Sequence, residues 1–95
     1  MSRNYYVYII TNKTQGVLYI GYTSNLSKRI WEHKNNLADG FSYRYKLHKL
    51  VYYEVCEESL SALERERQLK NWHREWKINL VEKMNPNWDD LSYLI

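Results

Sequence analysis

Two short segments on either side of a polar loop constrain the fold of this chain more than any other feature. Residues 5–11 (YYVYIIT) and 17–22 (VLYIGY) are rich in β-branched and aromatic side chains, which favour strands. The stretch between them, NKTQG, is polar and ends in glycine, a composition typical of hairpin loops. We therefore predict an antiparallel hairpin, in which a loop of residues 12–15 places Tyr8 directly opposite Tyr19.

The rest of the chain predicts a third strand and three helices. LVYYEVC repeats the strand composition of the hairpin, and the segments on either side of it have helical spacing or composition. Gly40 interrupts the segment before this strand, which we interpret as a loop or a short helical turn. The expected elements are a strand at 50–56, helices at 26–36, 59–72 and 74–84, a loop or turn at 38–49 and a tail at 87–95 that packs against the body.

Capping residues and a proline mark the ends of these helices. Residues 23–25 (TSN) supply N-cap side chains for the first helix. Ser61 and Glu64 have the spacing of a capping box in the second helix. Asn85-Pro86 ends the third helix, because proline cannot continue it.

Length and composition limit the fold to one small domain. A domain typically has about 100–150 residues, so we treat residues 1–95 as a single unit. Apolar residues make up 44% of the chain and aromatic residues 16%, enough for a thin core. With the elements above, this predicts an α+β fold: a small antiparallel sheet of about three strands flanked by helices.

Cysteine usage and hydropathy suggest where the protein resides. Cys56 is the only cysteine, so no intramolecular disulfide can form, and its apolar neighbours predict a buried thiol in a reducing compartment. The chain contains no signal-peptide core and no run of about 18 apolar residues. We therefore expect a cytoplasmic protein without a membrane span.

The first helix carries polar residues on its apolar side. Leu26, Ile30 and Leu37 define an apolar stripe at about 100° per residue. His33 falls inside this stripe and Arg29 at its edge, where buried donors are costly unless they are used. His33 is interpreted either as a core histidine bonded to a backbone carbonyl or as a functional group. Arg29 either snorkels, forms a structural salt bridge, or binds a ligand.

The second helix repeats this pattern with a carboxylate. Ala62, Leu63 and Leu69 mark its apolar arc, and Glu66 lies within the arc. A carboxylate is rarely buried without a cation, a donor or a metal. The structural alternative for Glu66 is an ion pair with a basic neighbour on the same helix, Arg65 or Lys70.

Basic residues gather in the middle of the chain. The overall charge is only +3, with a pI of about 9.0, but residues 28–49 contain six Lys or Arg and two His against one Glu and one Asp. Such an excess attracts phosphates through counterion release, although a solvated basic face is equally consistent with it. The residues expected to bind nucleic acid are Lys28, Lys34, Arg44 and Lys46.

Taken together, two tyrosines, an arginine and a lone glutamate supply the groups that phosphodiester hydrolysis needs. One carboxylate, with water and substrate oxygens, can hold Mg²⁺. The planar guanidinium of arginine matches phosphate oxygens. A tyrosine can orient or deprotonate a water activated by a metal.

The same residues resemble the GIY-YIG nuclease superfamily. Tyr6-Val7-Tyr8 stands where its first half-motif belongs, Tyr19-Ile20-Gly21 matches the second, and Arg29 and Glu66 follow in helices as the family pattern has them. The stretches ALERERQLKNW and WKINLVEKMNPNWDDL look like the small stand-alone members, whose cellular role is largely unassigned. The resemblance covers essentially the whole chain. It departs from the pattern at Tyr6, where the family name has glycine.

The resemblance implies a role for each matching residue. Glu66 would hold one divalent cation, Mg²⁺ or Mn²⁺, and Arg29 would bind the scissile phosphate. Tyr8 and Tyr19 would position or activate the attacking water, with the base between them left open. His33 matches a histidine seen in this branch, and it would contact phosphate or shuttle a proton. Gly21 would allow a close backbone approach.

The implied function is a metal-dependent endonuclease that hydrolyses DNA, in repair or processing, with a protein partner able to supply targeting. One alternative is a non-catalytic nucleic-acid-binding module, in which Tyr43 and Tyr45 stack on bases between the basic residues. Another is a protein-interaction adaptor with an exposed patch. The residues of that patch would be Trp72, Trp76 and Trp88.

Overall fold

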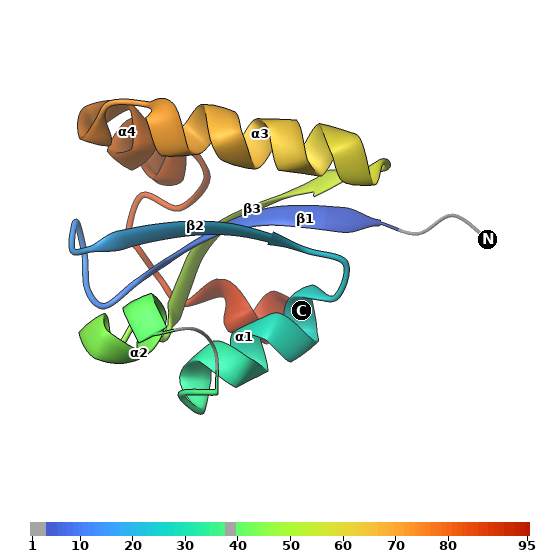
Figure 1. Ribbon diagram of the computed structural model, residues 1–95. Coiled ribbons are helices and arrows are strands. Elements are labelled where there is room, and N and C mark those ends of the chain that lie inside the picture. Colours follow the sequence, from blue (N-terminus) through green and yellow to red (C-terminus); the bar gives the residue numbers. More distant parts are fainter. Residues whose placement is uncertain (1–3, 38–39) are drawn as a thin grey trace.

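A three-stranded antiparallel sheet separates two helical layers (Figure 1). The structure is a computed structural model that describes residues 4–37 and 40–95. β1 lies at the centre of the sheet, with β2 and β3 at its edges. Helices α3 and α4 cover one face, and α1, α2 and the C-terminal 3₁₀ helix η1 lie on the other. The elements are β1 (Tyr5–Thr11), β2 (Leu18–Thr23), α1 (Leu26–Lys34), α2 (Gly40–Tyr45), β3 (Lys49–Cys56), α3 (Ser59–Asn71), α4 (Arg74–Met84) and η1 (Leu91–Leu94).

This arrangement confirms the fold class expected from the sequence. Each predicted strand and helix is present, with ends that differ by two residues at most. The segment left open between a loop and a short helical turn contains the six-residue helix α2. Among the described residues, no helix has the length and apolar character needed to cross a membrane.

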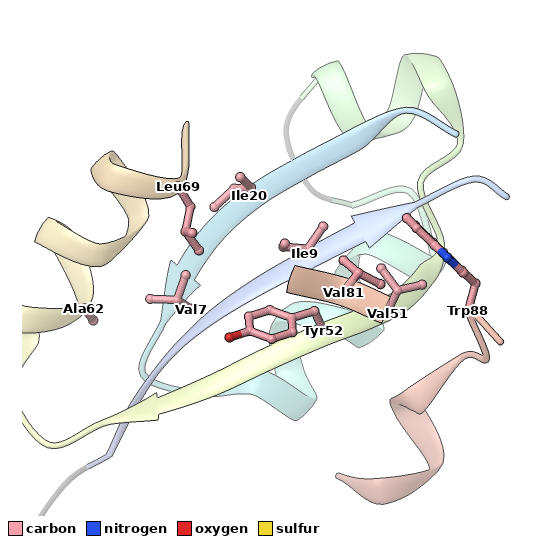
Figure 2. Close-up of a cluster of buried hydrophobic side chains, with 9 residues drawn as sticks. All are labelled: Val7, Ile9, Ile20, Val51, Tyr52, Ala62, Leu69, Val81 and Trp88. Carbon is pink, nitrogen blue, oxygen red and sulfur yellow. The ribbon is translucent and has the colours of Figure 1, made fainter. Parts of the chain in front are cut away.

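The side chains of β1 point alternately to the two faces of the sheet, and each face has its own hydrophobic core. Val7 and Ile9 point toward α3 and α4, where they pack with β-branched and aromatic side chains from the neighbouring elements (Figure 2). Tyr8 and Ile10 point the other way, toward α1. Because successive side chains of a strand project to opposite faces, one strand supplies both cores. All four side chains are fully buried.

The hairpin register differs from the predicted one by two residues. Tyr8 pairs with Gly21, and Tyr19 pairs with Ile10. The direct opposition of the two tyrosines was therefore wrong, because the loop covers residues 12–17 and is held by a bond from the Gly16 N–H to the Lys13 carbonyl (2.9 Å). A shift of two keeps both tyrosines on one face, as diagonal neighbours with ring centroids 6.4 Å apart.

The helix ends confirm one capping prediction and correct another. The Asn25 side chain accepts a hydrogen bond from the Lys28 N–H, as an N-cap does. The Ser61–Glu64 capping box was wrong, because α3 begins at Ser59 with Glu58 at its N-cap. Leu37 was also misplaced: it lies beyond the end of α1 and is exposed.

The C-terminal segment packs against the body as expected. Trp88 and Leu91 are buried, so Trp88 does not belong to an exposed patch. Asn85 is also buried, and its side-chain amide donates to the Val51 carbonyl (3.1 Å) and to the Asp89 carbonyl (2.8 Å). This amide fixes the tail to the sheet.

Asp90 ties the same tail to α1. Its carboxylate bonds to Nζ of Lys34 (2.5 Å) and accepts from the Leu50 N–H (3.2 Å). Burial raises the pKa of Asp90, but hydrogen bonds from Lys34 and Ser92 outweigh this effect and leave the pKa below its ordinary value. The carboxylate is therefore charged at neutral pH and holds α1 and η1 together.

At the β3 edge, a tyrosine, a glutamate and an arginine bond to one another. The Tyr52 hydroxyl donates to Glu54, and Nε of Arg65 donates to the same carboxylate at 2.7 Å. The Arg65 guanidinium also lies 5.3 Å from the ring centroid of Trp72. Burial, followed by the bond and charge of Glu54, raises the pKa of Tyr52 to about 12.

Cys56 ends β3 beside this group and is half-buried rather than buried as predicted. Burial, with a smaller contribution from the Glu54 charge, raises the pKa of the thiol. A thiol with a raised pKa is a weaker nucleophile at neutral pH. The residue therefore acts as a packing group.

Candidate active site

A cleft at the β2 edge brings together side chains from both helical layers. Its volume is about 390 Å³. Because β2 is an edge strand, α3 on one face of the sheet and α1 on the other both reach the cleft beside it. The lining residues are Tyr8, Tyr19, Gly21, Tyr22, Thr23, Ser24, Arg29 and Glu66.

All four residues central to the sequence-based hypothesis lie in this cleft. Tyr8 comes from β1, Tyr19 from β2, Arg29 from α1 and Glu66 from α3. They are separated by up to 58 residues along the chain (66 − 8). One open concavity therefore contains all four side chains.

Tyr8 lies beneath the cleft, in space that Gly21 leaves open. The two residues face each other in the ladder, and a Cβ on Gly21 would lie 2.5 Å from the Tyr8 hydroxyl oxygen. No side chain larger than hydrogen fits there unless the phenol moves. Gly21 therefore sets the position of Tyr8, a more specific role than a general close approach of the backbone.

The Tyr8 hydroxyl meets His33 of α1. The oxygen lies 3.0 Å from Nε2 of His33, within a buried hydrogen bond. His33 is 2% exposed and its ring is 5.7 Å from both tyrosine rings, centroid to centroid. This burial removes His33 from direct contact with a phosphate, and the three rings lie at the corners of a triangle because the two tyrosine rings are 6.4 Å apart.

The two tyrosines differ in access to solvent. Tyr8 is fully buried, whereas Tyr19 is half-buried and faces the cleft. A water molecule in the cleft thus meets the Tyr19 ring first, and Tyr8 with His33 supports that ring from below. The sequence offered no means to tell the two apart, because both occupy the same kind of strand position.

Arg29 borders the cleft from the first turns of α1. Its Nε lies 3.1 Å from Oε1 of Glu32, one turn along the helix, and its side chain is 41% exposed. Such a surface pair contributes about 0–1 kcal/mol to stability. A guanidinium that borders the cleft and is partly exposed has the planar donor geometry that matches phosphate oxygens.

Glu66 borders the cleft from α3. Its side chain is only 13% exposed, and its carboxylate lies 3.5 Å from Nζ of Lys70, the ion pair that the structural alternative foresaw. Lys70 itself is 52% exposed, so this pair is accessible to exchange. Glu64, two residues earlier on α3, is exposed to solvent.

A lone carboxylate fits one kind of metal site. Across residues 4–37 and 40–95, no group of three or more His, Cys, Asp or Glu side chains could hold a metal ion. Transition metals that need such a cage do not fit the donor set. Mg²⁺ does fit, since it binds through one or two carboxylates and takes its other ligands from water and phosphate.

The predicted basic residues are divided among different surroundings. Lys28 lines a hollow of about 170 Å³ together with Arg29, next to the cleft. Lys34 is held by Asp90 and by the His48 carbonyl (2.8 Å), so its ammonium already has structural partners. Arg44 and Lys46 are exposed, on and just after α2. Their binding to nucleic acid stays a prediction.

Three lining residues were not singled out from the sequence. Tyr22, Thr23 and Ser24 follow the second half-motif directly and form the wall between β2 and α1. Their position immediately after Gly21 was the available signal, because a strand that ends at a site continues into the loop that borders it.

The geometry agrees with the comparison to known families. Residues 4–79 match the GIY-YIG catalytic domain. The chain belongs to this family, which is a family of nucleases.

Within the family, the chain is similar to proteins named UPF0213. A UPF0213 protein of Syntrophus aciditrophicus is 40% identical over 90 residues, covering 90% of this chain and 97% of the relative. One from Clostridium perfringens is 38% identical over 76 residues (80% and 81%), and one from Staphylococcus saprophyticus is 33% identical over 79 residues (83% and 95%). No solved structure matches the chain.

Proposed function

We propose that this protein is a metal-dependent endonuclease that hydrolyses DNA phosphodiester bonds, in DNA repair or processing. The observation that carries the proposal is the convergence of Tyr8, Tyr19, Arg29 and Glu66 on one cleft. A divalent cation at Glu66, Mg²⁺ or Mn²⁺, would neutralise phosphate charge and lower the pKa of a water molecule.

The protein's own residues divide the remaining work. Arg29 binds non-bridging oxygens of the scissile phosphate and stabilises the charge that grows there in the transition state. Tyr19, which faces the cleft, orients the attacking water. The water oxygen forms a bond to phosphorus as the ester P–O bond breaks, and the departing oxygen takes a proton from solvent.

The buried pair below Tyr19 has a positioning role in this scheme. The Tyr8 hydroxyl and Nε2 of His33 are hydrogen-bonded, and the imidazole packs edge-on against both phenol rings, so the pair holds the Tyr19 ring in place. The proton lost by the attacking water leaves to solvent through the open cleft.

Nicking of supercoiled plasmid and cleavage of branched DNA, each with Mg²⁺ or Mn²⁺, test the proposal. We expect Glu66→Gln to lower the cleavage rate by about 10²–10³-fold, the usual loss when a group that stabilises transition-state charge is removed. Glu64→Gln is the matched control, since it removes an exposed carboxylate of the same helix and should retain activity. Equal cleavage by wild type and Glu66→Gln contradicts the proposal.

A non-catalytic nucleic-acid-binding module is the second candidate. Tyr43 and Tyr45, at 59% and 42% exposure, lie beside Arg44 on α2, away from the cleft. Stacking by these rings would give DNA affinity that falls with salt and does not depend on the cleft. Binding of this kind without cleavage of any substrate supports the module over the enzyme.

A further inference from the structure

A second pocket opens beyond the catalytic cleft, on the α1 face of the sheet. Its volume is about 450 Å³. It lies between the start of α1, the start of β1, the end of β3 and the end of the chain, which is drawn beside the start of α1 in Figure 1. The lining residues are Tyr6, Ser24, Asn25, Leu26, Ser27, Tyr53, Val55, Leu94 and Ile95.

One residue connects this pocket to the cleft. Ser24 lines the cleft, the second pocket and the small hollow that contains Lys28 and Arg29. Asn25 is shared by the hollow and the second pocket. The three depressions therefore adjoin one another around the start of α1. Lys28 and Arg29 line the small hollow.

The side chains that line the pocket are uncharged, and two of them are aromatic. Tyr6 and Tyr53 project from the same face of adjacent strands, since Tyr6 pairs with Val55 and Tyr8 with Tyr53. Around these rings stand Ser24, Asn25 and Ser27, whose side chains can both donate and accept hydrogen bonds.

We propose that this pocket binds an unpaired nucleobase of the DNA strand being cut. A base is planar and uncharged, with apolar faces for the tyrosine rings and polar edges for the Ser and Asn side chains. The phosphates of the strand that carries this base would lie over the small hollow, against Lys28 and Arg29. The volume is within the range of about 300–1,000 Å³ that small-molecule sites have.

The inference rests on the proposed function, which supplies DNA as the substrate. It adds a preference for one kind of DNA structure. A fully paired duplex holds its bases inside the stack, so it cannot fill the pocket without unstacking. Strands with a flap, a bulge or a single-stranded end present a base at no such cost. The enzyme would therefore prefer DNA with unpaired nucleotides near the cut.

Tyr6 allows the second pocket to be tested without a change to the residues that line the cleft. It lines the second pocket but not the cleft. Tyr6→Leu removes the ring while it keeps apolar bulk on β1, and Tyr6→Phe keeps the ring. Trp76→Leu on α4 is a matched control, since it removes an exposed aromatic ring on the other face of the sheet, away from the pocket.

The experiment measures 2-aminopurine fluorescence in short single-stranded oligonucleotides that carry the probe at one position each. The protein carries Glu66→Gln in every case, so that no strand is cut. We expect strong quenching at one position and its loss in Tyr6→Leu, with about 10-fold weaker binding, the usual effect of removing one stacking ring. Tyr6→Phe and Trp76→Leu should retain both signals.

A second variant blocks the pocket without touching the sheet. Ser27 is exposed on α1, and Ser27→Trp fills the pocket mouth, so it should also abolish the position-specific quenching. Quenching that is uniform along the strand, or unchanged in Tyr6→Leu and Ser27→Trp, overturns the inference. Cleavage by the wild-type protein is a separate measurement, so failure of the pocket and failure of the nuclease can be distinguished.

Discussion

The two edges of the sheet hold the same three kinds of side chain in opposite arrangements. At the β3 edge, Tyr52 and Arg65 both bond to Glu54, so the carboxylate has its partners within the group. In such a closed group the charges are satisfied by one another, which stabilises the protein.

The β2 edge opens the same set toward solvent. Arg29 and Glu66 lie on different sides of the cleft, and each pairs with a neighbour on its own helix, Glu32 or Lys70. Tyr19 lies between them on the strand. The comparison teaches that residue types alone do not define an active site; a site needs charged groups that border a common space and are not paired with each other.

Replacement of the two arginines by lysine should separate the edges most clearly. Arg29→Lys keeps the charge but loses the planar fork that matches phosphate oxygens, so we expect DNA cleavage to fall by about 10²-fold. Thermal unfolding should change little, because the pair with Glu32 is exposed. Arg65→Lys should show the reverse, with activity retained and the melting temperature lowered. Equal behaviour of the two variants would remove the distinction.

Gly21→Ala tests how strictly the cleft floor is built. The new methyl group would meet the Tyr8 hydroxyl, and overpacking of this kind costs about 1–3 kcal/mol. We expect a lower free energy of unfolding in urea and lower cleavage, because the phenol must move. Gly40→Ala is the control: no atom lies within 4 Å of its added Cβ. A fully active Gly21→Ala protein would show that the position of Tyr8 is unimportant.

Glu54→Gln probes the closed group. The change leaves Tyr52 and Arg65 without their shared charge, and we expect the free energy of unfolding to fall by about 1–2 kcal/mol. DNA cleavage should remain at the wild-type rate, since Glu54 does not line the cleft. Urea denaturation and plasmid nicking measure the two effects. Loss of activity in a stably folded Glu54→Gln protein would contradict the division between the edges.

The smallest effect concerns the pH dependence of stability. The pKa of Tyr52 is raised from 10.0 to about 12 in the folded protein, so folding favours the protonated phenol. Its contribution to stability is complete below pH 10 and is lost as the pH rises to about 12. The difference in stability between wild type and Tyr52→Phe should narrow over this interval. A constant difference would contradict the raised pKa.

Much of this molecule follows from local sequence patterns. Strand composition predicted the hairpin and β3. Arg29, His33 and Glu66, polar residues on the apolar sides of two helices, identified the helix faces that meet the site. These features depend on periodicity within one element, which a sequence displays directly.

Features that depend on distant partners could not be predicted in this way. The hairpin register depended on how many residues the loop takes up, and composition does not fix that number. Lys34 looked like a phosphate ligand, but Asp90, 56 residues further along, is its partner. The difference in burial between Tyr8 and Tyr19 follows from the strand order, which places β1 at the centre and β2 at the edge.

Because the C-terminal tail is bonded to α1, the position of Arg29 at the cleft depends on the last segment of the chain. The family match ends at residue 79, yet Asn85 anchors the tail and Asp90 grips Lys34, one residue after His33. The helix that presents Arg29 is thus braced by residues outside the matched region. A minimal version of this protein cut back to the matched boundary would keep every residue of the cleft and still lose the alignment of the helix that carries Arg29.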